Sequence, residues 1–124
     1  MTIAGPGLLP NHRASEALIL HDIRVALGRE PDLVLWRLNQ GITKDHTGKQ
    51  YRSGMVPGAA DLIGVLGPRG RWFCLEVKSP TGRLSREQKL FGSLVQRMGG
   101  SWACVRSVDD ARAALDRARN GGNG

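Results

Sequence analysis

The sequence predicts an α/β fold in which a mixed β-sheet is flanked by α-helices. Two observations lead to this prediction. Three amphipathic helical patterns alternate with short apolar runs that have the length of strands. Two of these runs, residues 61–66 and 73–78, are separated by a short turn at residues 67–70 and are therefore expected to form a hairpin. A hairpin with helices before and after it indicates an α/β sandwich around a mixed sheet.

The length of the chain leaves room for one compact domain. With 124 residues the chain can build a single hydrophobic core and no second one. We expect a loose N-terminal arm over residues 1–13, one domain over residues 14–118 and a flexible tail over residues 119–124, which is rich in Gly and Asn.

The charge of the chain favours a polyanionic partner. The formal net charge is +7, from 18 Lys and Arg against 11 Asp and Glu. Several basic residues stand in Gly-rich connections, where a phosphate could reach them: Lys44, Lys49, Arg52, Arg69, Arg71 and Arg83. The few aromatic residues do not interleave with these cations, so binding to the nucleic-acid backbone is favoured over stacking on bases.

Cysteine usage and hydropathy indicate a reducing compartment. Cys74 and Cys104 both fall in predicted strands, and two cysteines do not build a disulfide framework. Residues 1–10 are too short and too interrupted by Pro and Gly for a secretory segment, and no stretch is long enough to span a bilayer. We therefore expect a cytoplasmic protein without a membrane partner.

The first helix is predicted from Ser15 to Leu27. Its apolar residues form one stripe, Ser15 can cap its start and Gly28 suits its end. Glu16 has two interpretations that the residues alone leave open. A carboxylate in the first turn is favoured by the helix dipole, and the spacing of Glu16 to the apolar stripe also directs it inward, toward the sheet.

A long polar connection follows the first strand. Residues 33–38 and 102–105 are predicted as strands, and residues 39–60 as a Gly- and Lys-rich connection with a short extended piece at 50–52. A connection of this length in a compact domain is usually functional, so we interpret it as the rim of a substrate groove. The alternative is a disordered insert.

The strand at residues 73–78 carries two opposite charges on one face. Side chains alternate along a strand, so Cys74, Glu76 and Lys78 share one face, and the apolar residues form the other. Charged groups are almost never buried unless they are paired or bound to something. The hairpin brings Asp61, at the start of its first strand, beside Glu76 and Lys78 at the end of its second.

This predicted cluster favours a divalent cation. Two carboxylates at roughly 4 Å repel by about 4 kcal/mol at an effective dielectric constant of about 20. Lys78 offsets part of this repulsion, and a cation offsets more. Carboxylate oxygens suit Mg²⁺ or Mn²⁺ and not zinc, and Lys78 would orient a bound water or stabilise charge on a phosphodiester. A structural Glu76–Lys78 ion pair is the alternative, and it leaves Asp61 unexplained.

Two further helices complete the predicted fold. Ser85 and Gln88 have the spacing of a capping box at the start of one helix. The last helix begins after Ser107, with Asp109 and Asp110 as partners of its dipole rather than as a second metal site. The residues that we expect the former helix to bury are Leu90, Phe91, Leu94, Val95 and Met98.

Asp61, followed after the hairpin by Glu76-Val77-Lys78, resembles the D…(D/E)-x-K signature of the PD-(D/E)XK nuclease superfamily. Longer runs carry a more specific likeness: RLNQG at 37–41, YRSGMVPGAADLIG at 51–64, EVKS at 76–79, GRLS at 82–85, and Gln88. These runs are similar to the small stand-alone VRR-NUC domains of phages and bacteria, over about Glu16 to Leu115. Ala60 departs from the Pro of the superfamily signature, at a position that contributes no reactive group.

The resemblance implies a restriction-endonuclease-like core and a divalent-metal-dependent DNA endonuclease that uses Mg²⁺, with Mn²⁺ able to substitute. Asp61 and Glu76 match the metal-binding acids, Lys78 the motif lysine, Glu16 the first-helix acid and Gln88 the motif glutamine. The catalytic candidates are therefore Glu16, Asp61, Glu76, Lys78 and Gln88. The metal-ligand candidates are Asp61, Glu76, the backbone carbonyl of Val77, and Glu16.

The resemblance also implies partners. Some stand-alone members act as homodimers on branched DNA such as four-way junctions, so we expect branched DNA, a homodimer, and a phage or bacterial host cell. No organic cofactor is expected. Predicted nucleic-acid contacts are Lys44, Lys49, Tyr51, Arg52 and Arg83. The alternative is a non-catalytic nucleic-acid-binding module with the same fold, although such a module gains nothing from paired acids beside a polyanion.

Overall fold

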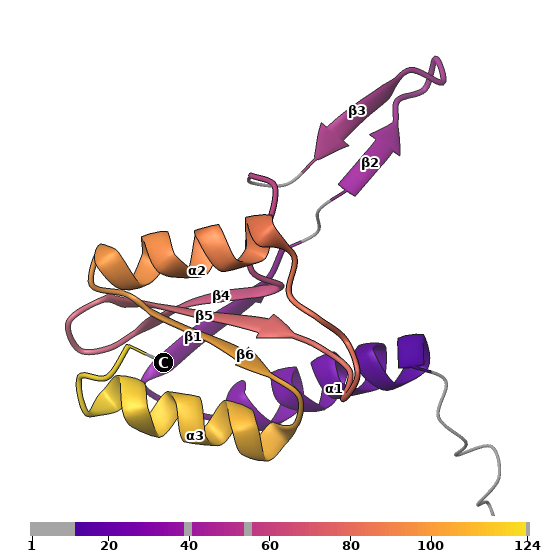
Figure 1. The fold of residues 1–124 in the computed structure, drawn as a ribbon. Coiled ribbons are helices and arrows are strands. Elements are labelled where there is room, and N and C mark those ends of the chain that lie inside the picture. The colour runs from indigo at the N-terminus through magenta and orange to yellow at the C-terminus, as the bar shows by residue number, and fades with distance from the viewer. Residues whose placement is uncertain (1–11, 39–40, 54–55, 124) are drawn as a thin grey trace, which may run out of the picture.

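The computed structural model describes residues 12–38, 41–53 and 56–123. Three helices and six strands follow one another within these ranges (Figure 1). In chain order they are α1 (His12–Leu27), β1 (Leu33–Arg37), β2 (Gly41–Lys44), β3 (Gln50–Ser53), β4 (Leu62–Leu66), β5 (Arg71–Val77), α2 (Arg86–Arg97), β6 (Ser101–Val105) and α3 (Val108–Arg119). No helix within these ranges has the length and apolar character that a membrane span requires.

Four strands form the central sheet in the order β1-β4-β5-β6. The pairs β1–β4 and β4–β5 are antiparallel, whereas β5–β6 is parallel. Helices α1 and α3 lie on one face of this sheet and α2 lies on the other (Figure 1). The predicted α/β architecture with a mixed sheet between helices is therefore confirmed.

The two faces of β5 belong to two separate hydrophobic clusters. Phe73, Leu75 and Val77 pack into the larger one, which lies under α1 and α3. Cys74 packs into the smaller one, under α2, together with Phe91. The alternation predicted for this strand is thus confirmed, and it places Glu76 on the α2 side of the sheet, since Glu76 shares the face of Cys74.

The long connection contains a hairpin that the sequence did not predict. Strands β2 and β3 pair antiparallel from Gly41↔Ser53 to Lys44↔Gln50. At the tip, an Asp45 Oδ1 atom accepts hydrogen bonds from the backbone N–H groups of Thr47 (2.8 Å) and Lys49 (3.0 Å). Only the extended piece at 50–52 was expected, because this polar hairpin lacks the apolar alternation of a core strand. A disordered insert is the wrong description for residues 41–53.

The start of α1 differs from the expected one. The helix begins at His12, so Ser15 lies inside its first turn and is not its cap. No acidic residue stands in the first turn, which removes the helix-dipole interpretation of Glu16. Residues 1–11 of the expected arm lie outside the described residues, whereas His12 and Arg13 belong to the helix.

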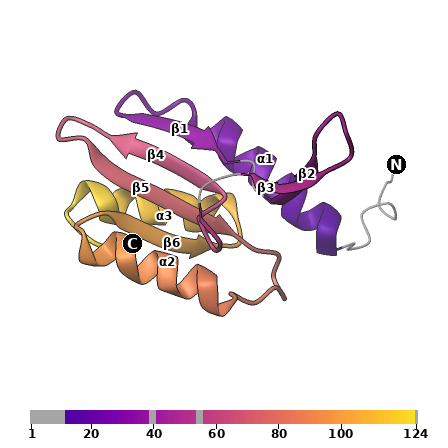
Figure 2. The ribbon, with the colours of Figure 1, turned by 90° about the horizontal axis from the view of Figure 1, so that it is seen from above.

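Helix α2 begins with the predicted capping box. The Ser85 hydroxyl oxygen accepts the Gln88 N–H at 3.1 Å, and Gln88 Oε1 accepts the Ser85 N–H at 2.8 Å. The expected burial of three α2 residues is wrong, because α2 packs mainly on β5 and β6 (Figure 2) and leaves Val34, Trp36 and Val65 on this face of β1 and β4 exposed. The three exposed α2 residues are Leu90, Leu94 and Met98.

The end of the chain is held more firmly than expected for a free tail at 119–124. Arg119 is the last residue of α3 and forms ion pairs with Glu30 (2.6 Å) and Asp32 (2.7 Å). The carbonyl oxygen of Asn123 accepts the backbone N–H of Trp102 in β6 at 2.8 Å. The tail therefore packs beside the edge strand of the sheet.

Candidate active site

The β4–β5 register brings the two predicted acids together. Leu62 pairs with Leu75, so Asp61 comes opposite Glu76 one step further along the hairpin. The Asp61 Oδ2 atom accepts the backbone N–H of Val77 at 2.8 Å. This bond fixes the Asp61 carboxylate against the end of β5.

Glu76 is a buried carboxyl group with one oxygen left unpaired. Only 2% of the residue is exposed. Its Oε2 atom accepts a hydrogen bond from Gln88 Nε2 at 3.1 Å, but Oε1 is buried without a hydrogen-bond partner among the described residues. The Glu76 carboxyl also has a hydrogen-bonding neighbour in the Asp61 carboxyl. That neighbour can be a partner only while one of the two acids carries a proton, so without a shared proton the site favours a water or an ion.

Burial together with the neighbouring Asp61 carboxyl, through a hydrogen bond and through its charge, raises the pKa of Glu76 to about 9. The charge of Lys78 opposes this increase in pKa, whereas the charge of Glu16 adds to it. Without a bound cation, Glu76 therefore holds a proton at neutral pH. A cation that replaces the proton would remove the repulsion between the two acids.

Gln88 connects the start of α2 to this acid. Its side-chain oxygen caps the helix, while its Nε2 donates to Glu76. Gly58 makes this arrangement possible, because a Cβ atom there would lie 2.3 Å from the Glu87 carbonyl group. The φ angle of Gly58 is +83°, which side-chain-bearing residues rarely adopt. The sequence shows a Pro57-Gly58 turn but not its contact with α2.

The second turn of α1 brings Glu16 to the same end of the sheet. Its Oε2 atom accepts the backbone N–H of Ser79, just after β5, at 3.4 Å. Glu16 thus points inward, as its spacing to the apolar stripe indicated. It lines a hollow of about 320 Å³ whose walls also include Arg37, Asp61 and Val77.

The donor set at this end of the sheet fits a hard divalent cation with water ligands. Asp61 and Glu76 supply carboxylate oxygens. The N–H and C=O groups of a strand residue point to the same side, so the Val77 carbonyl is on the side of β5 where its N–H donates to Asp61. Across the described part of the chain, no three His, Cys, Asp or Glu side chains group closely enough to hold a metal. Mg²⁺ commonly binds through one or two carboxylates and keeps several waters, so two acids are sufficient.

Hydrogen bonds from Arg106, the residue after the edge strand β6, hold the loop that follows β5. The Arg106 Nη1 atom donates to the carbonyl oxygens of Ser79 (2.5 Å) and Gly82 (2.7 Å). Lys78, which is half-buried, donates its backbone N–H to the Val105 carbonyl at 3.0 Å. The backbone of the motif lysine is therefore rigidly held beside Glu76.

The predicted nucleic-acid contacts lie on two exposed segments. Lys44 and Lys49 belong to the β2–β3 hairpin, which projects from the sheet (Figure 1), and Arg83 stands in the loop before α2. The hairpin leaves the sheet between the end of β1 and the start of β4, which is the end that carries Asp61. The side chains of Tyr51 and Arg52 lie outside the described residues.

Arg37 is a candidate functional residue that the sequence prediction missed. It stands at the end of β1, is exposed, and lines the hollow beside Glu16 and Asp61. Its place in the RLNQG run at 37–41 was a signal, but nothing local indicated that β1 would end next to the acids.

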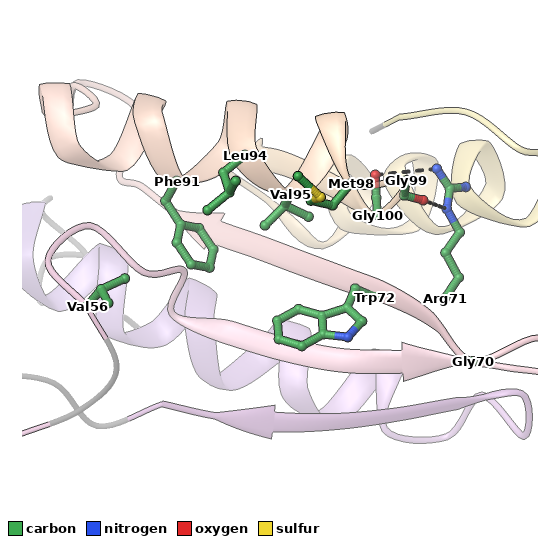
Figure 3. Close-up of a pocket in the computed structure, with 10 residues that line it drawn as sticks. All are labelled: Val56, Gly70, Arg71, Trp72, Phe91, Leu94, Val95, Met98, Gly99 and Gly100. Carbon is green, nitrogen blue, oxygen red and sulfur yellow. Dashed lines mark hydrogen bonds between the residues drawn. The ribbon is translucent and has the colours of Figure 1, made fainter.

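A larger hollow of about 630 Å³ lies away from the acids, between α2 and β5 (Figure 3). Its lining is mostly apolar and includes Trp72, Leu94 and Met98. The one cation in its lining, Arg71, donates to the Gly99 carbonyl at 3.0 Å and to the Ala118 carbonyl at 2.8 Å. Its walls offer no carboxylate, so the smaller hollow, which Glu16 and Asp61 line, is the better candidate for hydrolytic chemistry.

A comparison with family models is consistent with this geometry. The model described as VRR-NUC domain matches residues 9–109, which include both strands of the acid-bearing hairpin and the start of α2. No curated protein matches the chain.

Proposed function

The chain belongs to the VRR-NUC domain family, a family of nuclease domains, and from this premise we propose that it is a divalent-metal-dependent DNA endonuclease that hydrolyses phosphodiester bonds. One observation carries the proposal most of all. Glu76 is 2% exposed and lies in hydrogen-bonding contact with a second carboxyl, that of Asp61, while no N–H or O–H group of the described chain reaches its Oε1 atom. A fold built for stability alone would rarely keep that arrangement.

In this proposal Asp61, Glu76 and the Val77 carbonyl hold Mg²⁺, and Mn²⁺ can replace it. When bound there, the cation would act as a Lewis acid toward the phosphodiester and would lower the pKa of a coordinated water. Gln88 keeps the Glu76 carboxylate oriented through the hydrogen bond at 3.1 Å. Lys78 stabilises charge that develops on the phosphate, and Glu16 supplies a further carboxylate at the rim of the hollow.

The alternative function, a non-catalytic nucleic-acid-binding module, accounts for the charge of +7 but not for the acids. Carboxylates repel a polyanion unless a cation lies between them. A binding module would be more stable with an apolar residue at position 76, where burial now raises the pKa of the carboxyl to about 9. The buried acid therefore favours catalysis.

Branched DNA is the proposed substrate, on the basis of family resemblance together with the β2–β3 hairpin. This hairpin projects from the acid end of the sheet and exposes Lys44 and Lys49 (Figure 1). Two cations on a projecting arm suit contacts to a second phosphate backbone, away from the cleaved one. Such contacts read the shape of a DNA and not its sequence.

We also propose that the protein acts as a homodimer. The uncovered part of the sheet presents a row of apolar side chains, because Val34 pairs with Val65 and Val65 pairs with Trp72. These three are 53%, 36% and 48% exposed, and Trp36 beside them is 54% exposed. Two half-exposed tryptophans contribute roughly 150–250 Å² of the approximately 800 Å² per partner that a stable interface buries. Sedimentation as a monomer at working concentration would remove this proposal.

The function is tested by cleavage of labelled linear duplex, flap and four-way-junction DNA in Mg²⁺, Mn²⁺ or EDTA. We expect metal-dependent cutting that is fastest on branched DNA. Asp61→Asn and Lys78→Ala should abolish cutting but retain salt-sensitive binding, whereas the remote Arg97→Ala should cut normally. Binding without cutting under every metal would support the non-catalytic module.

A further inference from the structure

Arg37 is an exposed cation held at the acid end of the sheet. It is the last residue of β1 and pairs with Leu62 in β4. The next residue, Leu38, donates its N–H to the carbonyl oxygen of Asp61 at 2.9 Å. The backbone that carries Arg37 is therefore tied directly to the residue that carries the first acid.

The side chain of Arg37 lies on the α1 side of the sheet. It shares a strand face with Leu33 and Leu35, which pack toward the core under α1. On this side it lines the hollow together with Glu16, Asp61 and Ser79. The volume of about 320 Å³ is near the lower limit of small-ligand sites, roughly 300 Å³, and so suits a phosphodiester and its sugar rather than a base pair.

Arg37 has no ion pair or side-chain hydrogen bond with any other described residue, although it lines the same hollow as two carboxylates. Other arginines near acids in this chain do pair: Arg119 contacts both Glu30 and Asp32. An exposed guanidinium that does not use its donors internally remains available to a ligand. Its planar fork matches two oxygens of one phosphate.

We propose that Arg37 binds a phosphate of the DNA strand in this hollow and thereby positions that strand beside Asp61. The proposal rests on the nuclease function proposed above, whose site it extends by a substrate-binding residue. A cation at this position offsets the repulsion that the acids exert on an approaching phosphate. Since one guanidinium contacts one phosphate, Arg37 should contribute about one unit to the slope of the logarithm of the binding constant against the logarithm of the salt concentration.

The experiment compares Arg37→Ala and Arg37→Lys with wild type and with Arg97→Ala. The control removes the same charge from an exposed residue at the far end of α2, about 14 Å along the helix from Gln88. Binding of a labelled four-way junction is measured in EDTA between 50 and 200 mM salt, and single-turnover cleavage in Mg²⁺. Thermal melting with and without Mn²⁺, in the absence of DNA, reports whether the metal site is intact.

Arg37→Ala should bind DNA about 10- to 100-fold more weakly, with a salt slope smaller in magnitude by about one. Arg37→Lys should keep the salt slope of wild type but recover only part of its affinity for DNA, because the point charge of an ammonium replaces the bidentate guanidinium. Cleavage at subsaturating DNA should fall with affinity, and the Mn²⁺-dependent rise in melting temperature should stay at its wild-type value. Arg97→Ala should resemble wild type throughout.

Two outcomes would overturn the assignment. The first is an Arg37→Ala variant that binds and cuts like Arg97→Ala. The second is an Arg37→Ala variant that loses the Mn²⁺-dependent stabilisation, since Arg37 would then support the acids and not the phosphate. If wild type does not cut any DNA, the nuclease proposal fails, but the salt slopes still decide whether Arg37 contacts a phosphate.

Discussion

Replacement of Glu76 by Gln should make the metal-free protein more stable. The folded state raises the pKa of this carboxyl from 4.5 to about 9, so the folded state binds a proton that the unfolded chain releases above pH 4.5. The contribution of Glu76 to stability is therefore greatest below pH 4.5 and decreases as pH rises from there toward 9. At 1.36 kcal/mol per pH unit, the loss at pH 7 is about 3 kcal/mol.

Gln resembles the protonated acid, since it is neutral and nearly isosteric. Its amide oxygen can accept the hydrogen bond from Gln88 that Glu76 Oε2 accepts now, and its amide nitrogen can donate toward Asp61. We therefore expect Glu76→Gln to be more stable than wild type in EDTA by about 3 kcal/mol at pH 7, a melting-temperature increase of roughly 10 °C. The difference should shrink toward zero near pH 4.5.

The measurement is chemical denaturation in EDTA at several pH values between 5 and 8.5. Glu87→Gln, at an exposed position in the first turn of α2, is the control, and it should change stability by no more than about 1 kcal/mol. Saturating Mg²⁺ or Mn²⁺ should stabilise wild type, by about 2.7 kcal/mol at 100 times Kd, and should leave Glu76→Gln unchanged. A stability difference that does not grow with pH would show that Glu76 is not protonated in the folded, metal-free protein.

Three other predictions concern positions outside the acid pair. Gly58→Ala should destabilise the fold by about 1–3 kcal/mol, since its Cβ would meet the Glu87 backbone and its φ is +83°. Gly70→Ala is the milder control, because Gly70 has a φ of +74° but open space around it. Equal losses of stability in urea denaturation would contradict the contact with Glu87. Cys74, fully buried and with a pKa raised to about 12, should resist thiol reagents at pH 8 until the protein unfolds, as peptide mass spectrometry would show. The hydrogen bond from Arg119 lowers the pKa of Asp32, and the stabilising effect of this bond is present above pH 3.8 and is lost as pH falls. Arg119→Ala should therefore make stability depend less on pH in acid denaturation. An unchanged acid transition would exclude this contribution.

Local patterns were sufficient to predict most of the fold. Alternation along residues 73–78 assigned both faces of β5, and the Ser85–Gln88 spacing predicted the capping box, because both depend on residues a few positions apart. The approach of Asp61 to Glu76 could also be predicted, since a short turn fixes the register of a hairpin.

Features that depend on packing were predicted less well. The burial of Leu94 and Met98 was wrong, since a helical pattern shows which face is apolar but not how far the sheet beneath it extends. The polar strand β2 lacked the alternation that identifies core strands. Helix α1 began before its expected cap, because a serine signals a start only when no earlier residue continues the helix.

Spacing along the chain was enough to identify the residue types that could carry the chemistry: two acids, a lysine and a glutamine. Tertiary packing added that Glu16 reaches the backbone of Ser79, that Arg37 lies beside Asp61, and that Glu76 is buried, which raises the pKa of its carboxyl to about 9. The physical reason is that these properties arise between segments distant in the chain. Burial and charge proximity depend on how α1, β1 and the hairpin pack, which spacing along one segment does not encode.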